Sequence, residues 1–296
     1  MNTNDDRLYP FHLPDAGVRG QVAYLDSSWQ QILAHADYPA GVRQLLGESL
    51  AASAMFAGAL KFDGSLSIHL RSAGALRLLF AECTHAGELR GIARCNEGSV
   101  DAEVDLAQPG SQLAITIENA QTETRYQGLV PVESGRLAEA FESYFDRSEQ
   151  LPTRIMLVER DGRCAGIMLQ RVADTGGMSG SVDSDAWNRV SHLLATLGEE
   201  ELLDLPVETL LLRLFHEEGV ILQAGRPLRF NCSCSRERVL GMLRALGRDE
   251  AFAGIDETGK LRVTCEFCNR DYVLDEVDLA GQFAKVPAVP GPPTAQ

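Results

Sequence analysis

Four of the seven cysteines in this 296-residue chain lie in two short clusters. A Cys-x-Cys in extended backbone places both sulfurs on one face, because side chains alternate across a strand. A Cys-x-x-Cys across a tight turn also directs its two sulfurs at a common point. The clusters can therefore close a tetrahedral Zn²⁺ site that has no open position for a substrate. The predicted ligands of one zinc ion per reduced chain are Cys232, Cys234, Cys265 and Cys268.

Other uses of these cysteines are open. Reduced cysteines can be buried as small apolar residues, but polar residues flank both clusters: Asn231, Ser233, Ser235, Arg236 and Glu237, then Glu266, Asn269 and Arg270. A thiol–disulfide oxidoreductase would use only the Cys265-x-x-Cys268 pair and would leave the Cys-x-Cys without a role. A zinc deaminase needs a His-x-Glu and a Pro-Cys-x-x-Cys, and the sequence has neither. Metal binding is the prediction that uses all four residues.

The composition is that of an ordinary globular protein, with 45% hydrophobic and 23% charged residues, and the length suits about two domains. No apolar run approaches the roughly 18 residues of a membrane span. The first residues, Met1 to Leu13, lack the basic and apolar regions of a signal peptide. We therefore expect a cytoplasmic protein, in which clustered thiols bind metal rather than form structural disulfides.

The charge of the chain argues against polyanionic partners. The formal net charge is −15, which disfavours association with nucleic acid. Between residues 226 and 285 the basic and acidic residues nearly balance, whereas zinc modules that bind nucleic acid usually present a basic face. We expect neither nucleic acid nor membrane as a partner.

Alternation of apolar and polar residues predicts most of the structure of residues 1–173. Strands are expected over 18–26, 66–70, 76–83, 89–95, 113–118 and 122–130, and helices over 28–35, 40–60 and 135–146. Asp161-Gly162 signals a type I′ turn between strands 153–158 and 163–172. Residues 1–173 are expected to form an N-terminal α+β core domain around a mostly antiparallel sheet. The isolated Cys83, Cys95 and Cys164 are expected to be thiols of its core.

The composition changes after this domain. Residues 174–184 are a Gly/Ser linker, and residues 185–225 are expected to be a helical linker region with helices at 185–197 and 206–218. From Asp183 to Glu218 there are nine acidic residues and two arginines. The same helices carry broad apolar faces, so the segment must dock on another surface or stay poorly ordered.

Residues 226–285 are expected to form a small zinc-binding domain around the cysteine clusters. Ser235 can cap a helix over 236–246, whose N-terminus stabilises negative sulfur nearby. A hairpin of residues 261–264 and 272–274 carries the second cluster. Residues 286–296 contain four prolines and are expected to be a disordered tail.

Motifs along nearly the whole chain, in a fixed order, resemble one bacterial family. The most specific are Arg147-Ser148-Glu149-Gln150-Leu151-Pro152-Thr153, Arg213-Leu214-Phe215-His216-Glu217-Glu218 and the two cysteine clusters. Others include His35-Ala36-Asp37-Tyr38-Pro39 and Leu60-Lys61-Phe62-Asp63-Gly64. The chain resembles the redox-regulated 33 kDa heat-shock chaperonins, which are holdases.

The resemblance implies a binding protein rather than an enzyme. It implies that the reduced, zinc-bound form is inactive and that residues 226–285 are a redox-switch domain. Oxidants would convert Cys232 with Cys234, and Cys265 with Cys268, into disulfides and release zinc. The active protein would bind unfolding clients without ATP during oxidative and heat stress, commonly as a homodimer.

Energetic magnitudes are compatible with such a switch. Structural zinc contributes on the order of 10–16 kcal/mol to the folding of small zinc peptides, and a whole domain is typically stable by about 5–15 kcal/mol. A small module poor in apolar residues cannot offset the loss of zinc, so its release should unfold the module and affect the helices upstream. The predicted client-binding residues on these helices are Trp187, Val190, Leu194, Leu210, Leu211, Leu214 and Phe215.

Overall fold

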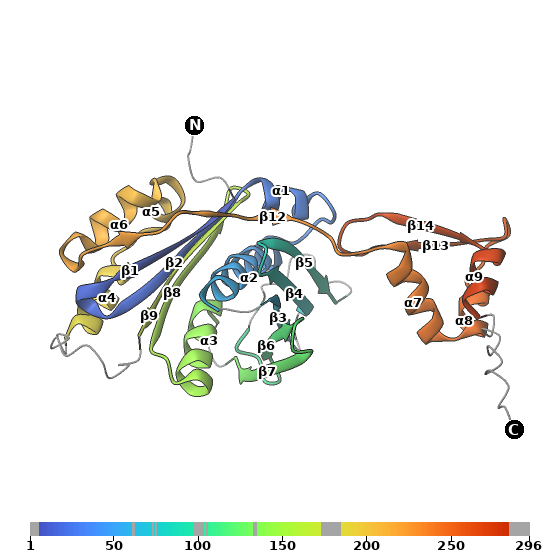
Figure 1. Ribbon diagram of the computed structural model, residues 1–296, viewed down its shortest axis with the longest axis horizontal. Coiled ribbons are helices and arrows are strands. Elements are labelled where there is room, and N and C mark those ends of the chain that lie inside the picture. The colour runs from blue at the N-terminus through green and yellow to red at the C-terminus, as the bar shows by residue number, and fades with distance from the viewer. Residues whose placement is uncertain are drawn as a thin grey trace, which may run out of the picture. The chain divides into compact units, whose positions relative to one another are not determined.

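The computed structural model describes residues 6–60, 63–72, 74, 76–96, 104, 106–132, 135–172 and 185–283. The expected linker at 174–184 and the expected tail at 286–296 lie outside these residues. The chain divides into two compact units, Met1–Asn231 and Cys232–Gln296 (Figure 1), and the second unit contains all four clustered cysteines. None of the helices in the described part of the chain combines the length and the apolar character that a membrane crossing requires.

The first unit contains two six-stranded sheets, here called sheet A and sheet B. Every strand pairing in sheet A is antiparallel. In spatial order, sheet A consists of β10 (Ile221–Leu222), β1 (Arg7–Leu13), β2 (Val18–Leu25), β9 (Arg163–Arg171) and β8 (Thr153–Arg160), and β11 (Arg226–Pro227) also pairs with β1.

Sheet B is also antiparallel except at one edge, where its first two strands run parallel. Because the strand at that edge follows β11 in sequence, the chain passes there from sheet A to sheet B. In spatial order, sheet B consists of β12 (Arg229–Phe230), β5 (Glu88–Cys95), β4 (Leu76–Thr84), β3 (Gly64–Arg71), β6 (Gln112–Asn119) and β7 (Thr124–Pro131).

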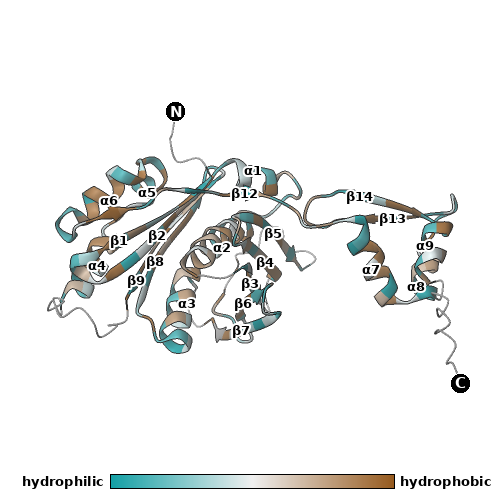
Figure 2. Ribbon diagram, in the orientation of Figure 1, coloured by the Kyte–Doolittle hydropathy of each residue, from teal (hydrophilic) through white to brown (hydrophobic). Residues whose placement is uncertain are grey.

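Helix α2 (Ala40–Ala59) contacts strands of both sheets and is the centre of the larger core of the first unit. Its residues are buried without interruption from Leu45 to Ala57. Most residues along the buried part of the helix are small or apolar (Figure 2), which is typical of a helix in the core of a protein. A Cβ atom at Gly47 would lie 2.5 Å from the sulfur of Cys164, so glycine is needed where the helix meets β9. The predicted helix over residues 40–60 is confirmed.

Two shorter helices complete the core around α2: α1 (Ser27–Leu33) and α3 (Leu137–Tyr144). Helix α3 continues into a π-helical turn, Phe145–Glu149, which ends at Gln150 in the left-handed conformation (φ 55°). The rings of Phe141 and Phe145 meet that of Phe56 on α2 edge to face. The π turn therefore extends the contact between α3 and α2.

A second core lies in the first unit between sheet A and three helices. These are α4 (Ala186–Ala195), α5 (Glu199–Asp204) and α6 (Val207–Phe215), followed by a 3-10 turn, His216–Glu218. Phe11 of β1 and Phe215 of α6 are fully buried there, with stacked rings 6.2 Å apart. The acidic segment after residue 184 therefore docks on a sheet, which was one of the two outcomes expected from its sequence.

The second unit is small. Its elements are α7 (Arg236–Leu246), α8 (Arg248–Ala253), β13 (Lys260–Thr264), β14 (Asp271–Asp275) and α9 (Glu276–Phe283). Its buried apolar residues are Val239, Leu243, Ala251, Leu261, Tyr272, Leu274 and Leu279. The guanidinium of Arg236 donates to the carbonyl of Val273 (3.0 Å) and pairs with Asp278, which connects α7 to the hairpin and to α9.

The predicted α+β fold with antiparallel pairing and a C-terminal four-cysteine module is confirmed. Asp161 and Gly162 both have positive φ, 53° and 72°, as the predicted type I′ turn requires. The details differ in three ways. The strands form two sheets rather than one, the strands β1, β10, β11 and β12 were not predicted, and the short helices α5, α8 and α9 were missed.

Glu48 gives the first unit a specific pH dependence. Its side chain lies on α2, is 8% exposed and accepts a hydrogen bond from Nε2 of Gln44 (2.8 Å). Burial raises its pKa from 4.5 to about 7, so the folded unit retains a proton that the unfolded chain releases. The free energy of unfolding should therefore fall by up to about 3 kcal/mol as the pH rises from about 4.5 to 7.

The variant Glu48→Gln cannot ionise and should make the first unit more stable than wild type at pH 8, with no difference at pH 4. Urea unfolding of the first unit at both pH values measures this. The matched control is Glu139→Gln on α3, whose side chain is 53% exposed and which should change stability little. Equal pH dependence in wild type and Glu48→Gln would contradict the assignment.

Candidate metal centre

The four clustered cysteines converge in the second unit. Their sulfurs all lie within 4.8 Å of one another, with 3.6 Å between Cys232 and Cys265 and 3.4 Å between Cys234 and Cys268. A tetrahedral zinc site with Zn–S bonds of about 2.3 Å has sulfur–sulfur edges of about 3.8 Å. In the part of the chain that the structure describes, no other group of His, Cys, Asp or Glu is arranged in this way. The donor set and its size fit Zn²⁺.

The first pair of cysteines lies on the short segment between β12 and α7. The backbone N–H of Cys234 hydrogen-bonds the sulfur of Cys232, which favours the thiolate form of Cys232. Ser235 caps α7 as predicted, with its hydroxyl accepting a hydrogen bond from the N–H of Arg238 (3.3 Å). The helix N-terminus next to Cys234 adds a partial positive charge that favours negative sulfur.

The second pair lies in the loop that joins β13 to β14. Thr264 and Asp271 are the last paired residues, so the ladder itself brings the ends of this loop together. The N–H of Asn269, which has φ of 52°, donates to the carbonyl of Cys265 (2.8 Å), and the N–H of Cys265 donates to the carbonyl of Arg270 (2.9 Å). The N–H of Arg270 hydrogen-bonds the sulfur of Cys268. The hairpin therefore fixes both sulfurs on one side of the loop.

The four thiols differ in how easily they ionise. Burial raises the pKa of Cys232 and of Cys268. Burial also opposes ionisation of Cys234, but hydrogen bonds outweigh it and lower its pKa to about 7, above all that from the hydroxyl of Tyr272 (3.1 Å). Four adjacent thiolates repel one another, whereas a bound divalent cation holds coordinating thiols deprotonated. The cluster is therefore suited to a metal cation.

The remaining cysteines lie outside the cluster, in the first unit, and no cysteine of the chain forms a disulfide. Cys83 and Cys164 are each 1% exposed, as expected of core thiols, whereas Cys95 is only half-buried. Burial raises the pKa of Cys83 to about 12 and that of Cys164 well above its ordinary value. These two thiols are poor nucleophiles while they stay buried.

The seven residues predicted to bind clients all lie where α4 and α6 meet sheet A. Trp187 and Leu214 are half-buried and pack against that core. Five are buried in it: Val190, Leu194, Leu210, Leu211 and Phe215. The apolar faces are therefore covered in this structure, and a client could reach them only if the helices left the sheet.

One ion pair in this region, with a buried carboxylate and a partly exposed arginine, was not predicted from the sequence. Glu218 was interpreted as part of a helix end, but its side chain is 2% exposed and pairs through both carboxylate oxygens with Arg189 of α4 (2.5 and 2.9 Å). Gly219, in the left-handed conformation (φ 67°), ends the 3-10 turn directly after it. An acidic residue followed by glycine at a helix end gave no signal that it would be buried.

Three comparisons relate the chain to known proteins. A family model described as "Hsp33 protein" matches residues 6–275. The 33 kDa chaperonin of Nitrosococcus oceani is 40% identical over 282 residues, which cover 95% of this chain and 96% of that protein. That of Ectopseudomonas mendocina is 43% identical over 277 residues, or 93% and 94%. The crystal structure of the 33 kDa chaperonin from Thermotoga maritima has a TM-score of 0.76 at 20% identity, covering 94% of this chain and 97% of that one.

Chelation of the metal should unfold the second unit and leave the first intact. Zinc-bound peptides of this size derive about 10–16 kcal/mol of folding free energy from the metal, and the residues of the second unit that the structure describes include only seven buried apolar ones to replace it. In reduced protein treated with a chelator, amides of α7, β13 and β14 should exchange at unfolded rates, while those of α2 remain protected. Hydrogen exchange measured by mass spectrometry tests this, and unchanged protection of β13 and β14 would contradict it.

The variant Tyr272→Phe should weaken zinc binding without unfolding the protein, because it removes only the hydroxyl that donates to Cys234. Loss of such an outer hydrogen bond typically lowers metal affinity about 10–100-fold. Competition with a chromogenic chelator measures the affinity. Tyr126→Phe on β7, which removes a hydroxyl bonded to Glu149 in the first unit, is the control and should bind zinc as wild type does.

Proposed function

The chain belongs to the Hsp33 family, and we propose that it is an ATP-independent holdase that is activated when its four clustered cysteines are oxidised. The family consists of chaperonins and not of enzymes, so the alternative of an oxidoreductase built on Cys265 and Cys268 is set aside. The observation that supports the proposal is a cluster of four thiols, sized for zinc, in a unit with a very small apolar core.

The proposed activation consists of two disulfide-forming reactions. A thiolate attacks hydrogen peroxide and becomes a sulfenic acid with release of hydroxide; a second thiolate then displaces hydroxide from that sulfur and closes the disulfide. Each disulfide thus takes two electrons from sulfur and consumes one peroxide. Zinc, when bound, would hold all four sulfurs as thiolates until this reaction removes them.

The proposed pairs are Cys232 with Cys234 and Cys265 with Cys268. All four sulfurs lie within 4.8 Å, so proximity in the folded cluster does not select these pairs. Loop closure in an unfolded module favours them, because closing a loop of three or four residues costs less entropy than closing one that spans both clusters. Neighbouring pairs are therefore favoured as soon as the module opens.

Unfolding of residues 226–285, the proposed switch domain, would then act on residues 185–225, the proposed helical linker. The apolar residues of α4 and α6 would become accessible if these helices left sheet A, and the many acidic residues there would keep a client complex in solution. We further propose that the active form is a homodimer, that the protein is cytoplasmic and that the reduced form holds one zinc ion per chain.

The test compares reduced and peroxide-treated protein at raised temperature. The reduced form should hold one zinc and seven free thiols, and the oxidised form no zinc and three free thiols. Only the oxidised form should suppress light scattering from a client protein that unfolds on heating. A variant with serine at Cys83, Cys95 and Cys164 is the control and should be activated normally. Equal suppression by both forms, or an unchanged zinc content, would refute the proposal.

A further inference from the structure

A short segment of the first unit, residues 226–231, occupies the edge of sheet B and is here called the strap. Its first part is β11, which pairs with β1 in sheet A, and its second part is β12, which pairs in parallel with β5. The N–H of Arg229 donates to the carbonyl of Gly87 (2.9 Å), and the N–H of Asn231 donates to that of Leu89 (3.0 Å). The strap therefore satisfies backbone groups that would otherwise form an open sheet edge.

The side chains of the strap alternate as those of a paired strand do. Leu228 is 5% exposed and belongs to the larger core, and Phe230 is half-buried with its ring 5.2 Å from that of His35. Arg229 points the other way and pairs with Glu88 at the surface (2.6 Å). Leu228 and Phe230, two residues apart, thus both pack beside the edge of β5, and the space that each side chain fills is here called its socket.

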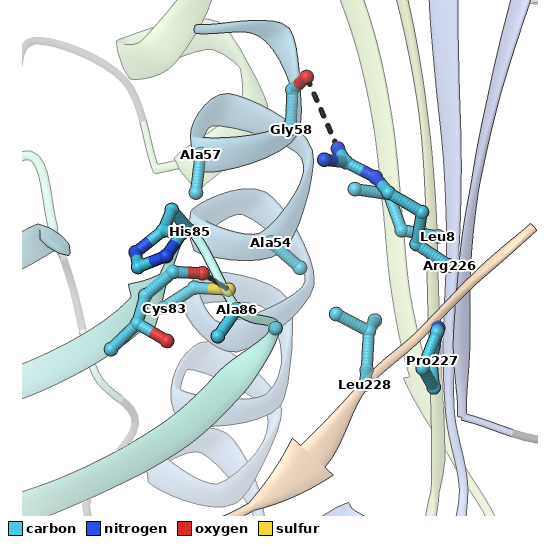
Figure 3. Close-up of a pocket in the computed structure, with 12 residues that line it drawn as sticks. Leu8, Ala54, Ala57, Gly58, Cys83, His85, Ala86, Arg226, Pro227 and Leu228 are labelled. Atoms are coloured by element: carbon cyan, nitrogen blue, oxygen red, sulfur yellow. Dashed lines mark hydrogen bonds between the residues drawn. The ribbon is translucent and has the colours of Figure 1, made fainter. Parts of the chain in front are cut away.

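The socket of Leu228 is larger than leucine needs. A cavity of about 170 Å³ adjoins it, lined among others by Leu8, Ala54, Ala57 and Cys83 (Figure 3). Arg226 of the strap borders it and donates to the carbonyl of Gly58 (3.3 Å). Gly87 faces the strap so closely that a Cβ atom there would lie 2.4 Å from the carbonyl oxygen of Pro227. The backbone of the strap therefore contacts Gly87 closely, whereas empty space remains beside the side chain of Leu228.

We propose that the strap occupies a client-binding groove: in the active protein, an extended segment of an unfolded client pairs with the edge of β5 and places apolar side chains, two residues apart, in the sockets of Leu228 and Phe230. Addition of an extended peptide to a sheet edge gives affinity through the backbone and preference through alternate side chains. The space beside Leu228 favours an aromatic residue at that position. The inference rests on the proposed function, which it deepens by naming the kind of segment that is bound.

Connectivity explains how the groove would open. The hydrogen bond from Asn231 is the last one between the strap and sheet B, and Cys232, a residue of the thiol cluster, follows at once. When the second unit unfolds, the chain beyond Asn231 becomes a flexible polymer, and the end of the strap is free to leave the edge. The strap and the client would compete for the same edge of β5. A lower effective concentration of the strap at that edge therefore favours binding of the client.

Cys83 reports on this groove, because it lines the cavity beneath the strap. Its alkylation by iodoacetamide in the full-length protein, measured by mass spectrometry, should become at least about tenfold faster after oxidation and slow again when a heat-unfolded client is added. Cys164 is the matched control, since it is equally buried but lies against Gly47 and Glu159 instead. Equal acceleration at Cys164 would mean general unfolding of the first unit and would overturn the proposal.

Peptide binding tests the sockets directly. Fluorescent peptides of residues 223–231 are titrated into oxidised full-length protein in three forms: native, Leu228→Phe, and Leu228→Asp with Phe230→Asp. The phenylalanine form should bind more tightly than the native one and the doubly substituted form at least about tenfold more weakly. Indistinguishable affinities would overturn the proposal.

The client-binding groove and the holdase activity can be refuted separately. Oxidised protein that suppresses client aggregation but leaves Cys83 slow to react would refute the groove and leave the proposed holdase intact. Oxidised protein that suppresses no aggregation would refute the proposed function itself, and with it this inference.

Discussion

The convergence of four cysteine sulfurs, arranged so that they could hold a metal ion, is the constraint around which the second unit is organised. One pair of cysteines precedes α7 and the other lies in the loop of the β13–β14 hairpin, so the cluster joins the helical part of the unit to its hairpin. Seven buried apolar residues are a small core for any fold, and units of this size generally need a metal or disulfides. If the cluster holds a metal as proposed, a reagent that removes electrons from the sulfurs would act on a main source of the stability of the unit.

The first unit is built on the opposite principle. Helix α2 is surrounded by two sheets and buries a continuous run of residues from Leu45 to Ala57. Its stability comes from apolar packing, which an oxidant does not change. Cys83 and Cys164 are part of that packing, and burial keeps both in the unreactive thiol form. An oxidant would therefore meet four clustered thiols in the second unit and isolated thiols, two of them buried, in the first.

Local signals in the sequence predicted the features that depend on local physics. The spacing of the cysteines predicted the cluster, Ser235 predicted a helix cap, and Asp161-Gly162 predicted a type I′ turn. Features that depend on distant partners were not predicted. Alternation shows which face of a strand is buried but not its neighbour, so the division into two sheets was missed. Strand β1 was missed as well, because Pro10 weakens a strand pattern. The burial of Glu218 depends on Arg189 in a different helix.

The docking of α4, α5 and α6 on sheet A combines weak and strong interactions in a way that suits a reversible contact. At its rim, Arg160 pairs with Glu200 and Arg163 with Asp204, but solvent reaches both pairs and weakens them by screening. The buried apolar residues of α4 and α6 carry most of the stabilisation. Charge on this segment therefore adds little to holding it in place. Once separated from the sheet, the helices would expose the apolar face that now stabilises the contact. The rest of the segment is acidic, so the segments of two chains would repel each other.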